Sequence, residues 1–316
     1  MKKLIALLAL TAASGIALAQ SSSPSTPKSA APSSTQQPTA QTPGTPNQSG
    51  PGGTTSQLPE AQPTGKRQPQ AKTQEEFKAY QDVTAKPDPA SMEQAADAFV
   101  KQFPDTELKG AVYQNLMLQY QGANNSDKTV EIGRKTIQMD PDNAVALVTV
   151  ASVLANRTRE TDLDKEERLA EAKKDANHAI ELMSSGAGVP ANVPAANAEA
   201  FKNTINSMAY ASLGQAEFVS NNFAAAEQSL RKATGYAGIQ PDPISWFQLA
   251  LTFDREQKYS DAATAASKCV EVAGTHPVKS YCQQELERAQ KAAANPPAAK
   301  PATPAATTTP APTTPK

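Results

Sequence analysis

One pattern of large and small side chains recurs through the middle of this chain. In one copy, Trp246, Leu249 and Phe253 are spaced as on one face of a helix, and Ala262 and Ala266 follow at helical spacing on a second helix. Copies begin near residues 110, 144, 207 and 243, which are 34, 63 and 36 residues apart. A single helix pair cannot bury both of its faces, so a period of this length predicts that neighbouring pairs stack on one another.

The wide spacing between residues 144 and 207 contains two insertions. The first, Asp162 to Met183, lengthens the second helix of its copy. The second contains Ser184 to Asn197, which cannot be helical throughout because it includes Pro190 and Pro194. This loop is either a contact site for a partner or a passive connector.

The pattern resembles the tetratricopeptide repeat. In that repeat, the first helix carries a large residue, a leucine and an aromatic residue at fixed positions, and the second helix carries small residues. The copy with Tyr210, Leu213 and Gly214 shares this pattern, as does the copy with Tyr113 and Gly133. The resemblance implies an all-α fold, an α-solenoid in which helix-turn-helix repeats form a right-handed superhelix. The expected domain is 74–294, with repeats at about 76–109, 110–143, 144–206, 207–242 and 243–276 and a capping helix at 277–294.

The first nineteen residues predict a secretory signal peptide. Lys2 and Lys3 precede an apolar run, and Ala17-Leu18-Ala19 is a typical cleavage site, so we expect cleavage after Ala19. No cysteine follows that could carry a lipid anchor, and the apolar run is too short to span a membrane. The sequence therefore predicts a periplasmic or secreted protein without a transmembrane helix.

Two segments that are poor in large apolar residues flank the repeats. Residues 20–73 are rich in Pro, Ser, Thr and Gln, and residues 295–316 are rich in Pro, Thr and Ala; together they contain most of the 26 prolines. Such compositions cannot bury enough apolar surface to offset the entropy of ordering. We expect both segments to be disordered, acting as spacers or as glycosylated or wall-contacting tails.

The resemblance also implies where a partner binds, because tetratricopeptide repeats bind peptides or protein surfaces in the concave groove that their first helices line. The matching positions are Gln114, Leu118, Gln121, Val148, Ser152, Asn156, Ala211, Gln215, Phe218, Phe247, Leu251, Asp254 and Arg255. Neutral polar and apolar side chains dominate, which favours an extended segment or a helix with apolar anchors. If the register differs by one residue, Phe218 and Phe247 are core residues instead.

The charge distribution disfavours a nucleic-acid partner. Acidic residues outnumber basic ones between residues 71 and 295, whereas binding to phosphates needs a concentrated positive face. The partner that we expect is a protein or peptide.

Cys269 and Cys282 are the two cysteines of the chain. An even number in a chain sent to an oxidising compartment suggests a disulfide, which would join the last repeat to the capping helix. The alternative is two separate buried thiols that pack as small apolar groups.

Sequence evidence for catalysis is limited to Asp175, His178 and Glu181, which share one helical face. They resemble half of a metal or acid–base site, although such a set more often forms a solvated face. No nucleophile elbow, phosphate-binding loop or HExxH motif occurs. We therefore expect no enzyme activity, cofactor or metal, and a scaffold that binds proteins; the alternative is a structural spacer of the cell envelope that uses its Pro/Thr-rich tails.

Overall fold

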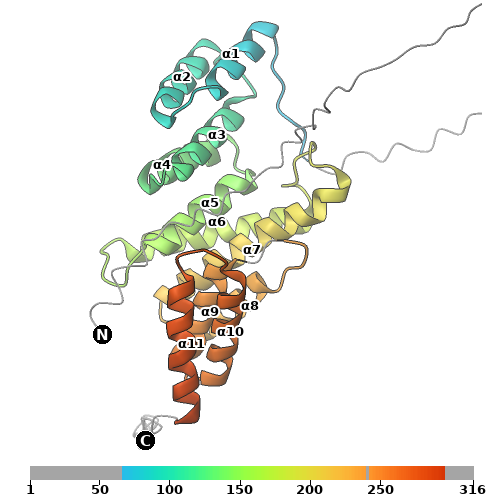
Figure 1. The fold of residues 1–316 in the computed structure, drawn as a ribbon. Coiled ribbons are helices and arrows are strands. Elements are labelled where there is room, and N and C mark those ends of the chain that lie inside the picture. The colour runs from blue at the N-terminus through green and yellow to red at the C-terminus, as the bar shows by residue number, and fades with distance from the viewer. Residues whose placement is uncertain (1–65, 240–241, 296–316) are drawn as a thin grey trace, which may run out of the picture. The chain divides into compact units, whose positions relative to one another are not determined.

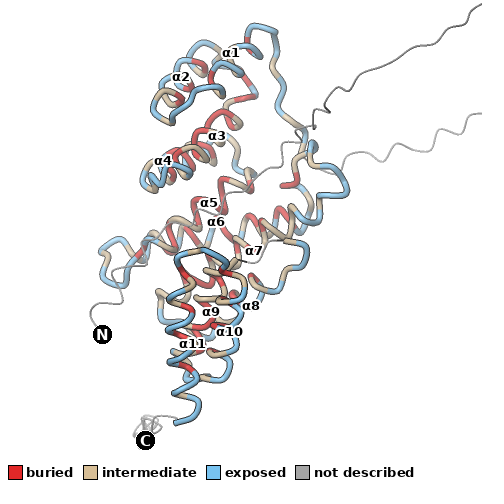
Figure 2. Tube along the Cα trace, viewed as in Figure 1, coloured by how far each residue is buried: buried red, intermediate tan, exposed pale blue. Residues whose placement is uncertain are grey.

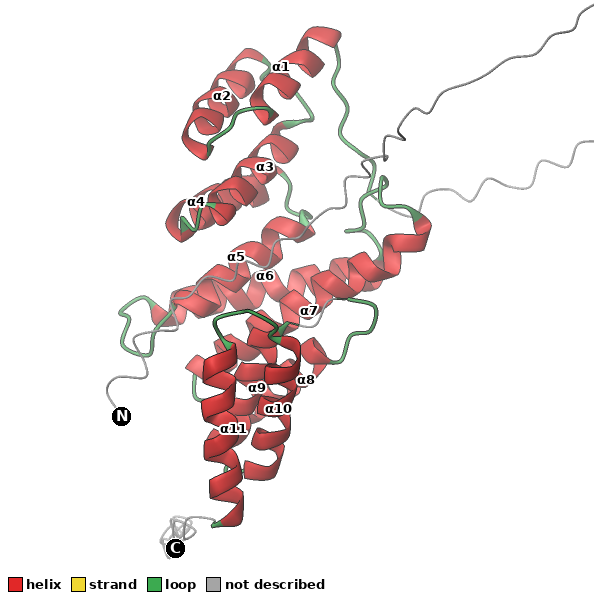
Figure 3. Ribbon diagram, viewed as in Figure 1, coloured by secondary structure: helices red, strands yellow, loops and turns green. Residues whose placement is uncertain are grey.

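In the computed structural model, residues 66–239 and 242–295 can be described, and they form eleven α-helices (Figure 1). The helices are α1 (Gln74–Thr84), α2 (Pro89–Gln102), α3 (Lys109–Gly122), α4 (Ser126–Met139), α5 (Ala144–Arg157), α6 (Lys165–Ser185), α7 (Ala195–Val219), α8 (Phe223–Thr234), α9 (Pro243–Arg255), α10 (Tyr259–Val272) and α11 (Lys279–Ala294). The described ranges contain no strand, as Figure 3 shows. The predicted all-α class is confirmed for this part of the chain.

Each helix packs against the next one in the sequence, and the odd-numbered helices also contact one another. Backbone contacts join α1 to α3, α3 to α5, α5 to α7, α7 to α9 and α9 to α11. The described even-numbered helices make no such backbone contacts with each other. Long charged side chains bridge some of them instead, as where Arg134 on α4 pairs with Glu171 on α6 at 2.5 Å. The odd-numbered helices are therefore the more closely spaced set.

Side chains at the helix starts explain several of the boundaries. Asn125 and Asn143 precede α4 and α5, and each accepts a hydrogen bond from a backbone N–H of the first turn. Asp242 does the same for two N–H groups of α9, and Pro243 occupies the first position of that helix. These bonds satisfy donors that have no partner inside a helix, so the helices begin where the capping residues stand.

The same turn connects three of the helix pairs. Asn124, Asn221 and Gln257 have φ angles of 58°, 60° and 61°, and each lies two residues before the next helix. In every case, the following N–H donates to a carbonyl five residues earlier, on Tyr120, Glu217 and Phe253 respectively. The first helix of each pair therefore ends in the same way, with a residue in the left-handed conformation followed by the same backbone hydrogen bond. The pairs α3–α4, α7–α8 and α9–α10 are geometrically equivalent in their connecting turns.

Small residues allow the paired helices to approach closely. A Cβ atom added at Gly214 on α7 would overlap the side chain of Leu230 on α8, and one added at Gly133 on α4 would overlap Val150 on α5. Ala172, Ala176 and Ala179 are likewise fully buried on α6. Figure 2 shows that the buried residues follow the sides along which the helices meet. The predicted role of small residues in close packing is confirmed at these contacts.

Two segment boundaries differ from the predicted ones. Helix α7 begins at Ala195, well before the expected repeat start at residue 207, because the chain after Pro194 continues as helix and extends α7 to 25 residues. Residues 66–73 were expected to belong to a disordered segment. Instead, Lys66 forms a parallel β-bridge with Pro190, and Thr73 caps α1.

The predicted signal peptide, most of the segment 20–73 and nearly all of the C-terminal tail lie outside the described residues. Within the described ranges, every helix is too short or too polar to span a bilayer. The predicted loop Ser184 to Asn197 is shorter in the structure, because α6 continues to Ser185 and α7 begins at Ala195; the part with Pro190 and Pro194 is not helical, as predicted.

Candidate functional site

The residues predicted to line a groove lie on four odd-numbered helices. Helix α3 carries Gln114, Leu118 and Gln121, and α5 carries Val148, Ser152 and Asn156; α7 carries Ala211, Gln215 and Phe218, and α9 carries Phe247, Leu251, Asp254 and Arg255. The structure divides them into buried, internally paired and open positions. Val148 and Gln215 are buried, with exposed fractions of 0% and 4%.

A polar contact joins α5 directly to α9. The side-chain amide of Gln248, which is 4% exposed, donates to Asn156 Oδ1 at 3.1 Å. Asn156 in turn donates to the backbone oxygen of Ser152 at 2.9 Å. The sequence did not point to Gln248, because its partner lies four helices earlier. The contact links α5 to α9 through their side chains, so both polar groups are already paired within the fold.

Several predicted groove residues on the last helices pack internally. Phe247 on α9 contacts Tyr281 on α11, with ring centroids 6.3 Å apart. Asp254 on α9 pairs with Arg288, which is also on α11. Phe218 meets Phe223 edge to face at 5.5 Å. Arg255 lies above both of these rings, 5.5 and 5.8 Å from their centroids. Phe218 and Phe247 are both half-buried, so they are not the fully buried core residues of the alternative interpretation, although their rings contact other side chains of the fold.

The open positions are therefore concentrated on α3, α5 and α7. Leu118, Gln121, Ser152 and Ala211 are half-buried, and on α9 the predicted groove residue Leu251 is half-buried as well. Gln114 is also half-buried, and its Oε1 accepts a hydrogen bond of 2.8 Å from Asn143. These side chains are uncharged, so this surface can offer amide hydrogen bonds and small apolar contacts to a ligand.

Two triads of a carboxylate, a tyrosine and a lysine link α2, α3 and α4, and the sequence analysis did not identify them. Tyr113 donates to Asp97 at 2.5 Å, and the Lys135 ammonium lies 2.9 Å from Asp97 and 4.0 Å from the tyrosine ring centroid. Tyr120, Glu93 and Lys128 repeat the arrangement. The sequence signal was the seven-residue spacing on both α3 and α4, which places equivalent residues on one helix face.

The pKa values of the triad tyrosines argue against an acid–base role. Burial, together with the adjacent Glu93 carboxylate, raises the pKa of Tyr120 to about 12. The pKa of Tyr113 is also raised. The larger cause is burial, and the second is its hydrogen bond to the Asp97 carboxylate. Both phenols therefore stay protonated near neutral pH and donate hydrogen bonds. The triads can hold α2 and α4 to α3, which is a structural role.

Asp175, His178 and Glu181 on α6 do not converge on one point. His178 Nε2 lies 3.1 Å from Asp142 Oδ1, Glu181 is exposed, and Asp175 is 6% exposed. Burial, followed by repulsion from Glu171, raises the pKa of Asp175 to about 6. The expectation of a solvated face is thus wrong for Asp175, which lies among the buried alanines of α6.

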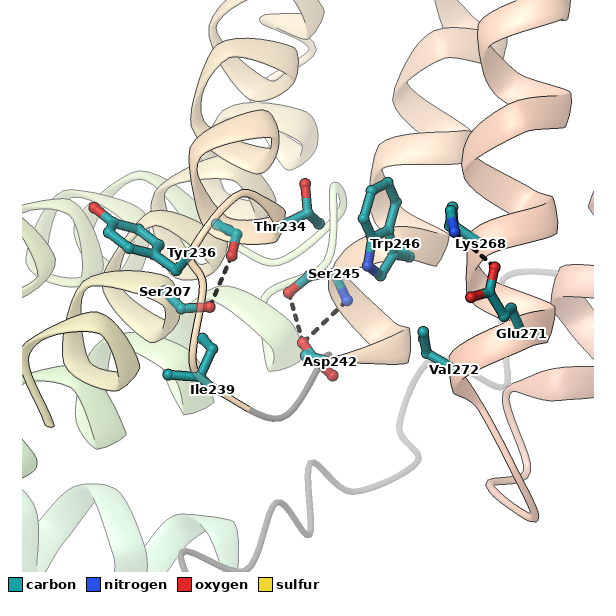
Figure 4. Close-up of a pocket in the computed structure, with 11 residues that line it drawn as sticks. Ser207, Thr234, Tyr236, Ile239, Asp242, Ser245, Trp246, Lys268, Glu271 and Val272 are labelled. Atoms are coloured by element: carbon teal, nitrogen blue, oxygen red, sulfur yellow. Dashed lines mark hydrogen bonds and ion pairs between the residues drawn. The ribbon is translucent and has the colours of Figure 1, made fainter. Parts of the chain in front are cut away.

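A pocket of about 230 Å³ lies where α7, α8, α9 and α10 meet. Figure 4 shows the aromatic and aliphatic side chains of Tyr236, Ile239, Trp246 and Val272 around it. The polar groups beside them bond to one another: Ser207 donates to the Ala233 carbonyl at 2.9 Å, and Lys268 pairs with Glu271 at 2.7 Å. The sequence indicated Trp246 as a repeat position, but nothing in it predicted this pocket.

Cys269 on α10 and Cys282 on α11 form a disulfide in the structure, with Cα atoms 5.8 Å apart. Both residues are fully buried and lie beside Val278 and Ala273. The bond joins α11 to the last helix pair, as expected for one of the two alternatives that the sequence left open.

The loop Ser184 to Asn197 is covered in part by the chain itself. Val189 is 8% exposed, and its carbonyl accepts a hydrogen bond from the backbone N–H of Lys66 at 2.9 Å. This loop is therefore more than a connector, because it holds the residues that precede α1.

Comparison with known proteins adds no family. No family model matches the chain, and a search of curated proteins finds no match.

Proposed function

We propose that this protein is a non-catalytic scaffold of the tetratricopeptide type, which binds a protein or peptide segment on the face of its first helices. The observation that carries the proposal is the backbone contact between successive odd-numbered helices, without corresponding contacts between the described even-numbered ones. A stack whose members approach more closely on one side curves toward that side. The odd-numbered face is then the concave one, where a segment can contact several helices at once.

The open side chains on this face indicate what kind of segment fits. Leu118, Gln121, Ser152 and Ala211 are half-buried and uncharged. Amide and hydroxyl groups can pair with the backbone of an extended segment, and the aliphatic groups can contact its apolar side chains. The absence of charge on these four residues favours a neutral ligand with apolar anchors over an acidic or basic one.

The proposed binding region is narrower than the set of groove positions derived from the sequence. Asn156 is already bonded to Gln248 of α9, and side chains of α11 contact Phe247 and Asp254. We therefore place the ligand along α3, α5 and the adjoining part of α7. The residues of α9 help to hold α5 and α7 in place and do not contact the ligand in this proposal.

We also propose that the protein acts outside the cytoplasm. The signal-like sequence before Ala19 motivates this, and the Cys269–Cys282 disulfide supports it, because such bonds persist mainly in oxidising compartments.

The test is a quantitative pull-down from the envelope fraction of the source cells with the full chain and three variants. Gln121→Arg and Ser152→Arg place a long charged side chain on the proposed face. Gln138→Arg makes the same change at an exposed position of α4 and is the matched control. We expect the first two variants to lose at least about tenfold in recovery of the partner, which corresponds to about 1.4 kcal/mol, while the control retains it. Equal recovery with all three variants would exclude this face as the binding site, provided that far-UV circular dichroism shows them folded.

A further inference from the structure

The residues just before α1 lie along the loops that join successive helix pairs. Lys66 contacts the α6–α7 loop and the C-terminal end of α4, and Arg67 contacts the α2–α3 loop. We call Lys66–Lys72 the arm. It contacts three of these loops with seven residues, although the sequence placed it in a disordered segment.

The backbone of Lys66 is paired on both sides. Its N–H donates to the Val189 carbonyl at 2.9 Å, and its carbonyl accepts from the Ala191 N–H at 3.0 Å. This is an isolated parallel bridge between Lys66 and Pro190, and its two bonds align the arm with the α6–α7 loop at this residue. The loop thus selects an extended conformation at this residue.

The side chains of the two basic residues meet separate carboxylates. The Lys66 ammonium pairs with Asp140, the residue that follows α4, and Arg67 Nη2 lies 2.8 Å from Glu107 Oε2. Glu107 also accepts the backbone N–H of Gln70 at 3.0 Å, and this bond, followed by Arg67, lowers its pKa. Two fixed acidic groups therefore match two consecutive basic residues of an extended chain.

We propose that this loop edge is a recognition site for extended segments with two adjacent basic residues. The chain's own Lys66–Arg67 occupies the site, and a Lys–Arg segment of a partner protein competes for it. The site is formed by the loops after α2, α4 and α6, so it is distinct from the first-helix face and does not depend on the function proposed for that face.

The contacts of the arm are weak enough for another segment to displace it. The Arg67 side chain is 69% exposed and the Lys66 side chain 39%, and ion pairs at such exposure contribute little and are screened by salt. The arm is joined to α1 by only a few residues. Such a short connection gives the arm an effective concentration in roughly the millimolar range at its site, which keeps it bound although the contacts are weak. A free segment at comparable concentration can therefore replace the arm.

The experiment measures hydrogen exchange at the Ala191 amide, because its N–H is bonded to Lys66. In the full chain with Lys66→Glu and Arg67→Glu, we expect exchange at Ala191 to accelerate by about tenfold relative to the unmodified protein. The Cys282 amide, bonded to the Val278 carbonyl at 3.0 Å at the start of α11, should keep its rate and reports on global folding.

A synthetic peptide with the sequence of residues 62–72 is then added to this variant at millimolar concentration. We expect it to restore protection at Ala191, whereas the same peptide with Gln in place of Lys66 and Arg67 does not. Adding Asp140→Asn and Glu107→Gln to the variant should abolish the effect of the first peptide. Unchanged exchange in the first variant, restoration by both peptides, or restoration by neither would each overturn the proposal.

A salt titration provides a second measurement if exchange at Cys282 shows that the charge-reversal variant is unfolded. In the unmodified protein, raising NaCl from about 0.05 to 0.5 M should weaken protection at Ala191 while protection at Cys282 persists. Protection at Ala191 that does not respond to salt would contradict recognition through the two carboxylates.

Discussion

Gln248 on α9 donates a hydrogen bond of 3.1 Å to Asn156 on α5, although 92 residues separate them in the chain. Neither helix is the sequence neighbour of the other, and both also contact α7. The bond satisfies a Gln248 amide that is almost fully buried, and it links two helices that are not neighbours in the sequence.

We predict that Gln248→Ala and Asn156→Ala each lower the free energy of unfolding by about 1–2 kcal/mol, because each removes a hydrogen bond between the buried Gln248 and the half-buried Asn156. Urea denaturation of the two single variants and the double variant gives the coupling free energy between the two side chains, which we expect to be about 1 kcal/mol. Strict additivity of the two single effects would show that the contact adds no stability.

Gly214→Ala should destabilise the fold by roughly 1–3 kcal/mol, because the added methyl group overlaps the Leu230 side chain. Gly122→Ala is the matched control: its added Cβ would have no atom within 4 Å, and it should be neutral or gain up to about 1 kcal/mol from reduced chain entropy. Thermal unfolding of both variants checks this. Equal shifts in Tm would contradict close packing at Gly214.

The buried carboxyl of Asp175 should make stability depend on pH. Its pKa of about 6 in the fold is above the ordinary value of 3.8, so the folded state binds the proton more tightly, and the contribution of this group to stability falls as pH rises from about 4 to 7. Asp175→Asn should therefore stabilise the protein by roughly 1–3 kcal/mol at pH 7.5, and its advantage should shrink toward pH 4. Denaturant unfolding at several pH values measures this.

The exposed Glu181 on the same helix provides the control for that series. Glu181→Gln should change stability little at any of these pH values. An advantage of Asp175→Asn that stays constant from pH 4 to 7.5 would show that the carboxyl is not protonated in this range.

The recurring turn predicts a stabilising substitution. Gln257 has a φ of 61°, where the equivalent turns have asparagine, which tolerates this conformation better. Gln257→Asn should raise the unfolding free energy by roughly 0.5–1 kcal/mol, and the reverse change Asn221→Gln should lower it by a similar amount. Chemical denaturation measures both; shifts of the same sign would refute the equivalence of the two turns.

Much of the local structure could be predicted from particular residues. The spacing of Trp246, Leu249 and Phe253 predicted a helix face, and all three lie on α9. The pattern around Tyr210 and Gly214 likewise predicted the close packing of α7 on α8. Such predictions succeed because helix periodicity and steric limits act within one element or between adjacent ones.

The candidate binding surface was harder to predict. Gln215 and Val148 occupy the same helical positions as half-buried residues of other pairs, yet they are buried. The reason is the closer approach of α5 to α7, two helices connected through the long α6 and the loop that contains Pro190. Spacing within a helix specifies which face a residue lies on, but the exposure of that face depends on what packs against it.

The sequence by itself determined the helical class and the helix faces that carry the large and small residues, because apolar spacing and steric limits act over a few residues. The tertiary structure alone decided that Lys66 and Arg67 meet Asp140 and Glu107, and that Asn156 meets Gln248. These partners lie 40 to 92 residues apart, and their meeting depends on how helices of unequal length stack, which no local pattern encodes.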